Sequence, residues 1–103
     1  MTIEVFFWEG CPSTAEAEAL LDEVLLSHGL DATVEWREVR TQEEAEALRF
    51  VGSPTIRVDG RDVDPYGAEH GRPSLTCRVY SLPTGVSPVP SREQIERALG
   101  VAA

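Results

Sequence analysis

The sequence predicts an α/β domain, because short β-branched and aromatic segments alternate with amphipathic segments along its 103 residues. Capping boxes and Gly or Pro breaks divide these segments into the order β-α-β-α-β-(β)-β-α. This length fits one domain, and no internal repeat, low-complexity tract or linker composition divides it. We therefore expect a single domain over residues 1–103.

The first strand is predicted over residues 2–8, which are β-branched and aromatic and place alternate side chains on one face. The period then changes, and residues 15–28 predict an amphipathic helix. Pro12 suits its first turn, and Gly29 suits the left-handed position after its end. The residues on its inward face would be Ala17, Leu20, Leu21, Val24, Leu25 and His28.

A second strand is predicted over residues 33–39. Thr41 and Glu44 then match a capping box, which predicts a helix that runs to about Arg49. The inward residues of this strand and helix would be Val34, Trp36, Ala45 and Leu48.

Residues 55–58 predict a third strand, and Asp59-Gly60 after it is a strong hairpin turn. Residues 75–82 predict another strand. Its alternating apolar face would consist of Leu75, Cys77 and Val79. Residues 61–74 and 83–90 are rich in Gly and Pro, and we expect them to be irregular.

The last helix is predicted from a second capping box, formed by Ser91 and Gln94, and should end at Gly100. Its inward residues would be Ile95, Ala98 and Leu99.

The charge balance excludes several functions. Nine basic and 18 acidic residues give a net charge of −9, which argues against nucleic acids and anionic membrane surfaces as partners. All nine basic residues are Arg, so Schiff-base chemistry and a lysine general base are excluded. No stretch reaches the roughly 18 apolar residues of a membrane span, and residues 1–7 lack the features of a signal peptide. We expect a cytoplasmic monomer with free thiols.

The most informative segment is Gly10-Cys11-Pro12-Ser13-Thr14, at the junction of the first strand and helix. A thiol at a helix N-terminus lies near unpaired backbone N–H groups and the positive end of the helix dipole. Both favour the thiolate, which is the nucleophilic form. Cys11 is therefore the candidate nucleophile. A small buried apolar role for this side chain is the alternative.

A second signal is Ser53-Pro54 directly before a predicted strand. A proline there cannot donate to the sheet, and a cis Ser53–Pro54 bond would fit a tight turn into the strand, although trans is the usual form of an X–Pro bond.

These motifs, together with the Val58–Arg61 hairpin, resemble the thioredoxin-like superfamily over most of the chain. They are most similar to glutaredoxins and to small bacterial thioredoxin-fold proteins of unassigned activity. The resemblance implies a three-layer α/β/α sandwich, with a mixed four- or five-stranded sheet and three helices. It implies Cys11 as the nucleophile, Pro54 as a cis-proline and Ser53 as the backbone partner of the substrate. Trp8 and Pro12 are further candidates for the substrate groove, with packing in the strand as the alternative role of Trp8.

The chain departs from that family at Thr14, which stands where the resolving cysteine of a C-x-x-C motif would be. Three alternatives remain: glutathione or another external thiol resolves the mixed disulfide, Cys77 resolves it, or the protein does not turn over. No cofactor or metal is expected, although glutathione could act as a reductant. Its carboxylates would need a cation, and the candidates are Arg57, Arg61 and Arg78.

Whether Cys77 reaches Cys11 depends on the sheet. If residues 61–64 pair with the third strand, the chain returns to the Cys11 end and residues 75–82 begin a fifth strand nearby. If residues 61–74 form one long loop, Cys77 starts far from Cys11. Only the first arrangement allows Cα atoms within the 4.4–6.8 Å or so that a disulfide needs. Otherwise Cys77 is a core-facing strand residue.

Other candidates have simpler explanations. His28 offsets a helix dipole, and His70 lies in a solvated loop, although it could join the cysteines at a soft-metal site. Trp36 is expected in the core. The acidic residues that we expect to be simply solvated are Glu16, Glu18, Asp22, Glu23, Glu43, Glu44 and Glu46.

Two functions follow as hypotheses. The first is a thiol–disulfide oxidoreductase that uses Cys11 on a disulfide or thiol substrate, either a protein or a small molecule. The second is a non-catalytic module of the same fold that binds a peptide, a soft metal ion or a thiol at the same groove.

Overall fold

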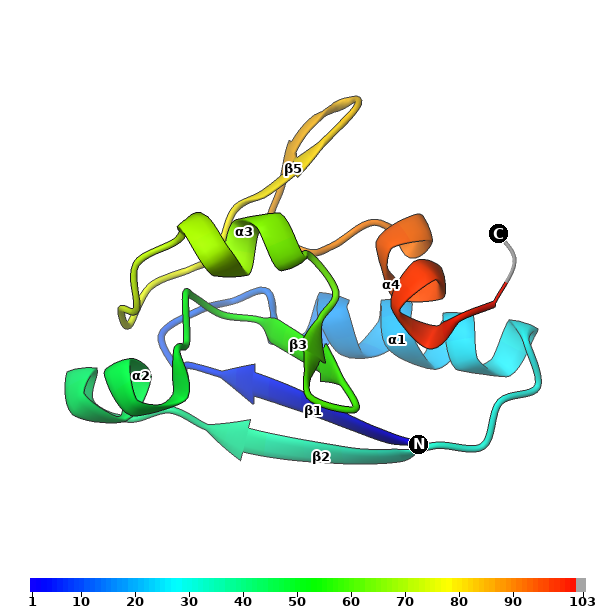
Figure 1. The fold of residues 1–103 in the computed structure, drawn as a ribbon, viewed down its shortest axis with the longest axis horizontal. Coiled ribbons are helices and arrows are strands. Elements are labelled where there is room, and N and C mark those ends of the chain that lie inside the picture. Colours follow the sequence, from blue (N-terminus) through cyan, green and yellow to red (C-terminus); the bar gives the residue numbers. More distant parts are fainter. Residues whose placement is uncertain (102–103) are drawn as a thin grey trace.

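The computed structural model describes residues 1–101 and shows a mixed α/β chain with a four-stranded sheet and four helices (Figure 1). The sheet has the strand order β2-β1-β3-β4. Its strands are β1 (Thr2–Phe7), β2 (Thr33–Glu38), β3 (Thr55–Val58) and β4 (Arg61–Asp62). β1 lies parallel to β2 and antiparallel to β3, and β3 is antiparallel to β4. The helices are α1 (Thr14–Ser27), α2 (Gln42–Leu48), α3 (Pro65–His70) and α4 (Arg92–Leu99).

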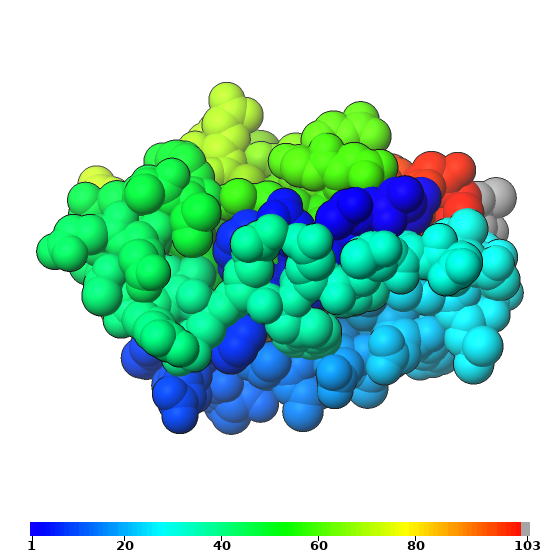
Figure 2. All heavy atoms as spheres, turned by 90° about the horizontal axis from the view of Figure 1, so that it is seen from below, coloured from blue at the N-terminus to red at the C-terminus, as the bar shows by residue number. Residues whose placement is uncertain are grey.

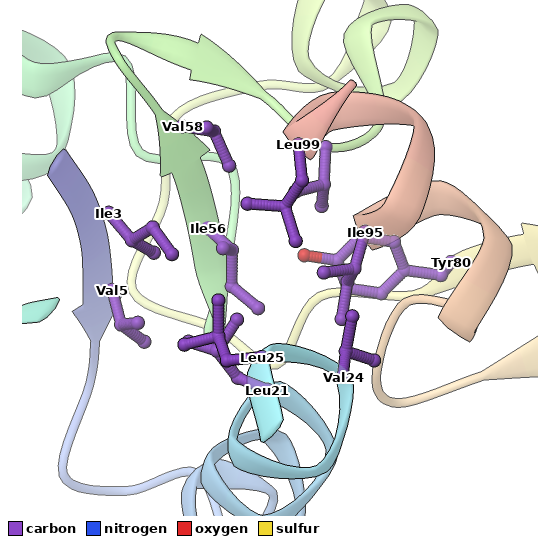
Figure 3. Close-up of a cluster of buried hydrophobic side chains, with 11 residues drawn as sticks. Ile3, Val5, Leu21, Val24, Leu25, Ile56, Val58, Tyr80, Ile95 and Leu99 are labelled. Carbon is purple, nitrogen blue, oxygen red and sulfur yellow. The ribbon is translucent and has the colours of Figure 1, made fainter. Parts of the chain in front are cut away.

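One face of the sheet is covered by α1 and α4. Alternate residues of the central strands point into this layer, as the period of two requires. Figure 3 shows this core, with the side chains of both helices directed toward β1 and β3. Its members from the strands and helices include Ile3, Val5, Ile56, Val58, Leu21, Val24, Leu25, Ile95 and Leu99. Burial of each such side chain contributes about 1.5–3 kcal/mol.

A second apolar cluster occupies the other side of β1. Phe6, which points away from the first core, packs with Ala45 of α2 and with Phe50. Trp8 and Leu75 lie against this cluster. Helices therefore pack on both faces of the sheet. Figure 2 looks at the molecule from the β2 side, where teal residues of this edge strand partly cover the blue N-terminal strand.

Several local predictions are confirmed. The capping boxes at Thr41 and Ser91 both form, with each hydroxyl accepting from a backbone N–H 3.1 Å away. Gly29 and Gly100 follow α1 and α4 with φ of 60° and 76°. The turn at Asp59-Gly60 joins β3 to β4 as predicted.

Three local predictions, for Trp36, Leu48 and Pro12, are wrong. Trp36 is 37% exposed and makes an edge contact with Phe7, so it is not a core residue. Leu48 is likewise exposed, because α2 turns only Ala45 inward. Pro12 lies before the first turn of α1, whose N-cap is Ser13.

The stretch 61–74 is more regular than its composition suggests. Arg61–Asp62 pairs with β3, and Pro65–His70 forms α3, which makes four helices rather than the expected three. Asp64 is the N-cap of α3 and accepts from the Gly67 N–H at 3.2 Å, while Pro65 fills the first helical position.

The predicted strand 75–82 has the right period but the wrong phase. Cys77 and Val79 are exposed, whereas Arg78 and Tyr80 are buried. Only β5 (Tyr80–Leu82) is a strand, and it pairs with β6 (Gly85–Ser87) rather than with the main sheet. This hairpin extends away from the body of the molecule (Figure 1).

Candidate functional site

The candidate site begins with the tight turn that follows β1. The Cys11 N–H donates to the Trp8 carbonyl at 3.0 Å, and the Trp8 ring lies so close to Gly10 that a Cβ there would overlap it. The turn delivers the Cys11 thiol to the start of α1, in a position where its side chain is only 5% exposed.

Ser53 is fully buried and forms hydrogen bonds with every other segment of the site. Its Oγ accepts from the Trp8 N–H at 3.1 Å, and its carbonyl accepts from the Cys11 Sγ at 3.4 Å. Its N–H donates to the Thr76 carbonyl at 2.8 Å, and its carbonyl also accepts from the Arg78 N–H at 2.8 Å. The Ser53–Pro54 peptide bond is cis, and the Pro54 ring is buried.

This pairing corrects the role expected for Ser53. The resemblance assigned its backbone to an extended substrate, but both its N–H and its carbonyl are bound to residues 76–78 of the chain itself. A buried backbone group needs a partner, and here the protein supplies it.

The same pairing brings the second thiol to the first. Cys77 lies opposite Ser53 as in a parallel sheet, while Cys11 bonds to the Ser53 carbonyl. The two cysteines are therefore neighbours, although both are free thiols. Of the two chain paths considered from the sequence, the one with a 61–62 hairpin is observed. Residues 75–79, however, do not add a fifth strand to the sheet.

The surroundings of the two thiols shift their pKa values in opposite directions. Burial raises the pKa of Cys11, but hydrogen bonds from Cys77, Ser13 and Ser53 outweigh it and leave the pKa below its ordinary value. The Cys11 side chain in turn raises the pKa of Cys77, with a smaller contribution from burial. The Ser13 backbone is among the donors to Cys11, as expected at a helix N-terminus. Of the two thiols, Cys11 therefore has the lowered pKa and Cys77 the raised one.

A buried ion pair fixes the segment that carries Cys77. The Arg78 guanidinium is 3% exposed and contacts Asp62 through two bonds of 2.8 and 2.9 Å. It also donates to Thr55 Oγ1 at 3.3 Å and stacks over the Tyr80 ring at 4.4 Å. The Tyr80 hydroxyl donates to the Pro54 carbonyl at 2.5 Å. Arg78 therefore contacts Thr55 of β3 and Asp62 of β4. Because Cys77 precedes Arg78, these contacts also fix the position of Cys77.

Gly52 permits the close approach of the two segments. Its φ is +124°, and a Cβ at this position would lie 2.8 Å from the Arg78 Cα. Sequence reasoning considered Arg78 only as a cation for glutathione, because an arginine between apolar residues suggests a solvent-facing position, and it missed Asp62 and Tyr80. The sequence signal for a close approach of another segment was Gly52, directly before Ser53-Pro54.

The remaining candidates are placed as follows. Thr14 is the first residue of α1 and half-buried, Pro12 is exposed, and Trp8 is half-buried beside the Cys11 turn. His28 is the C-cap residue of α1, and its Nε2 lies 2.6 Å from a carboxylate oxygen of Glu96. His70 lies on α3, stacked on Tyr66 at 4.1 Å. Within residues 1–101, no three His, Cys, Asp or Glu side chains are grouped to hold a metal ion.

The three arginines considered for an anionic thiol have different surroundings. Arg78 is buried on Asp62 and is not free to bind glutathione, so that suggestion is wrong. Arg57 donates to the Leu48 carbonyl at the end of α2, while Arg61 is exposed. Arg57 and Arg61 line one open cleft of about 490 Å³ between α2, α3 and the β3–β4 hairpin.

None of the described helices is long and apolar enough to cross a membrane. Comparison with models of known protein families, with curated proteins and with solved structures found no match to this chain.

Proposed function

We propose that this chain is a thiol–disulfide oxidoreductase of thioredoxin-like fold, in which Cys11 and Cys77 form the redox pair. The supporting observation is that Ser53 holds both cysteine-bearing segments, through its carbonyl to Cys11 and through its backbone pairing to residues 76–78. Cys77 then supplies the second sulfur of the pair, which the C-x-x-C motif lacks because Thr14 stands at that position.

The arrangement of the elements supports the proposed fold. A central β1 lies parallel to β2 and antiparallel to β3, and helices cover both faces, as the superfamily resemblance implies. The Cys11 turn and the Ser53-Pro54 turn lie at the same end of these strands.

The proposed reaction is a two-electron exchange. The two protein thiols become one disulfide, and the substrate disulfide is reduced to two thiols, so that electrons and protons balance. Glutathione or another small thiol would return the protein to its reduced form. The lowered pKa of Cys11 supports this chemistry. It increases the fraction of Cys11 that is present as the nucleophilic thiolate, and a thiol of lower pKa is also the better leaving group.

A second candidate is a non-catalytic module that binds a thiol or a peptide at the same place. The burial of Cys11 and the occupied backbone of Ser53 favour it, because both restrict access of a substrate to the first thiol.

Mass spectrometry and turnover distinguish the two candidates. The reduced protein would be treated with oxidised glutathione, and its mass and free thiols measured. An oxidoreductase should lose two hydrogens and both thiols, and should turn over a glutathione mixed disulfide. Cys11→Ser and Cys77→Ser should each abolish the bridge, whereas Ser81→Ala, an exposed change in β5, should not. If the wild type never forms the bridge and shows no cysteine-dependent turnover, the non-catalytic module is the better description.

A further inference from the structure

The two thiols differ sharply in access to solvent. Cys11 is 5% exposed, enclosed by the Trp8–Cys11 turn and by Ser53. Cys77 is exposed, on an extended segment in which Thr76 and Val79 are exposed as well and Arg78 is buried. Thiol–disulfide exchange requires the attacking sulfur to approach the disulfide in line, which a buried sulfur prevents for any sizeable partner. Only Cys77 meets this requirement from outside.

The backbone pairing explains why this difference is fixed. Ser53 engages residues 76–78 through their main chain, with two bonds of 2.8 Å, and Arg78 anchors the same segment through a buried side chain. Because side chains alternate along an extended segment, the inward Arg78 turns its neighbour Cys77 outward. Because Arg78 faces inward, the Sγ of Cys77 faces solvent.

Given the proposed function, we infer that external thiols and disulfides react at Cys77, which carries the mixed disulfide, and that Cys11 is the internal sulfur that resolves it. This order is the reverse of the one implied by the position of Cys11 at the start of α1. It assigns the substrate class as a disulfide that can reach an exposed extended segment, such as a small-molecule disulfide or a disulfide on a protein surface.

The steps balance as follows. The Cys77 thiolate attacks one sulfur of the substrate disulfide, forms a mixed disulfide and releases the first substrate thiolate. The Cys11 thiolate then attacks the Cys77 Sγ, which breaks the mixed disulfide, releases the second substrate thiolate and forms the Cys11–Cys77 bridge. The two protons of the protein thiols end on the two substrate thiols. In the reverse direction an external thiolate attacks Cys77, and Cys11 leaves as the thiolate that its hydrogen bonds stabilise.

Two single-cysteine variants test the order of attack. Cys11→Ser keeps the exposed thiol and also removes the neighbour that raises the pKa of Cys77. Cys77→Ser keeps the buried thiol and a hydroxyl that can still donate to it. Each reduced variant would be mixed with oxidised glutathione at neutral pH, and the glutathionylated fraction followed by mass spectrometry. The same reactions in denaturing urea give the rates without burial.

We expect Cys11→Ser to form its adduct at least tenfold faster than Cys77→Ser in buffer, with the difference lost in urea. Faster reaction of Cys77→Ser in buffer, or a difference that persists unchanged in urea, would overturn the inference. The wild type separates this outcome from failure of the proposed function. If it forms the intramolecular bridge but the order of the variants is reversed, only the order of attack is wrong. If it never forms the bridge, the redox pair itself is wrong.

Discussion

Replacement of Arg78 by methionine should cost this protein a large part of its stability. The Arg78 side chain is 3% exposed and that of Asp62 is 7% exposed, and two short bonds join them. Methionine keeps an unbranched apolar side chain but does not reach Asp62, so the carboxylate stays buried without its ion-pair partner and keeps only the Asp64 N–H as a donor. Removal of one member of a buried ion pair typically costs about 3–5 kcal/mol.

That loss is large compared with the total free energy of unfolding, which is about 5–15 kcal/mol for a typical domain. Arg78 also stabilises three other groups, because it donates to Thr55 Oγ1 and the Asp64 carbonyl and lies over the Tyr80 ring. We therefore expect a loss toward the upper end of the range.

Urea unfolding followed by circular dichroism measures the effect, with two comparison variants. Arg40→Met removes a guanidinium that pairs with Glu38 at 3.1 Å but is 73% exposed, so its cost should be under about 1 kcal/mol. The double variant Asp62→Leu/Arg78→Met removes both buried charges and should recover at least half of the single-variant loss. The reasoning is refuted if Arg78→Met and Arg40→Met cost the same, or if the double variant is no more stable than Arg78→Met.

Three further predictions concern the site and the core around it. Cys77→Ala should raise the pH midpoint of Cys11 alkylation, because burial already raises the pKa of Cys11 and the hydrogen bond from Cys77 is the largest influence that lowers it; an unchanged midpoint would contradict this. Gly52→Ala should destabilise the fold by about 1–3 kcal/mol in urea unfolding, because φ is +124° and the new Cβ would lie 2.8 Å from the Arg78 Cα. The hydrogen bond from His28 is the main reason that the pKa of Glu96 lies below its ordinary 4.5, so the ionised form stabilises the fold above that pH and this contribution is lost as the pH falls through the folded value. Glu96→Gln should therefore be less stable than the wild type at neutral pH, and the gap should close in acid; a gap independent of pH would refute the assignment.

Elements with strong local signals could be predicted from the sequence. The capping residues Thr41 and Ser91 have side chains that complete their own helix termini, so the structure depends on only a few neighbouring residues. The hairpin turn at Asp59-Gly60 is similarly local. The position of Cys11 between β1 and α1 also followed from a change of hydrophobic period within a short segment.

The part of the site that could not be predicted depends on contacts between distant segments. A hydrophobic pattern places Cys77 inside and Arg78 outside, but the buried Asp62 carboxylate and the Tyr80 ring reverse that phase. A shift of one residue exchanges the two faces of an extended segment. The ion pair that buries Arg78 therefore turns the Cys77 side chain toward solvent. The short helix α3 was missed because Gly67 and Pro65 suggested a loop, although Asp64 is an ordinary N-cap.

A disulfide between the two neighbouring cysteines, as we propose, would link the redox state of the protein to the entropy of its unfolded chain. A bridge between residues 11 and 77 would close most of the sequence into one loop, which in the chain-entropy treatment destabilises the unfolded state by about 4 kcal/mol. The same free energy must appear in the reduction potential, because the native fold holds the two thiols at a high effective concentration. Any change that loosens the Ser53 contacts would therefore make the bridge easier to reduce, and the potential would report on the integrity of the fold.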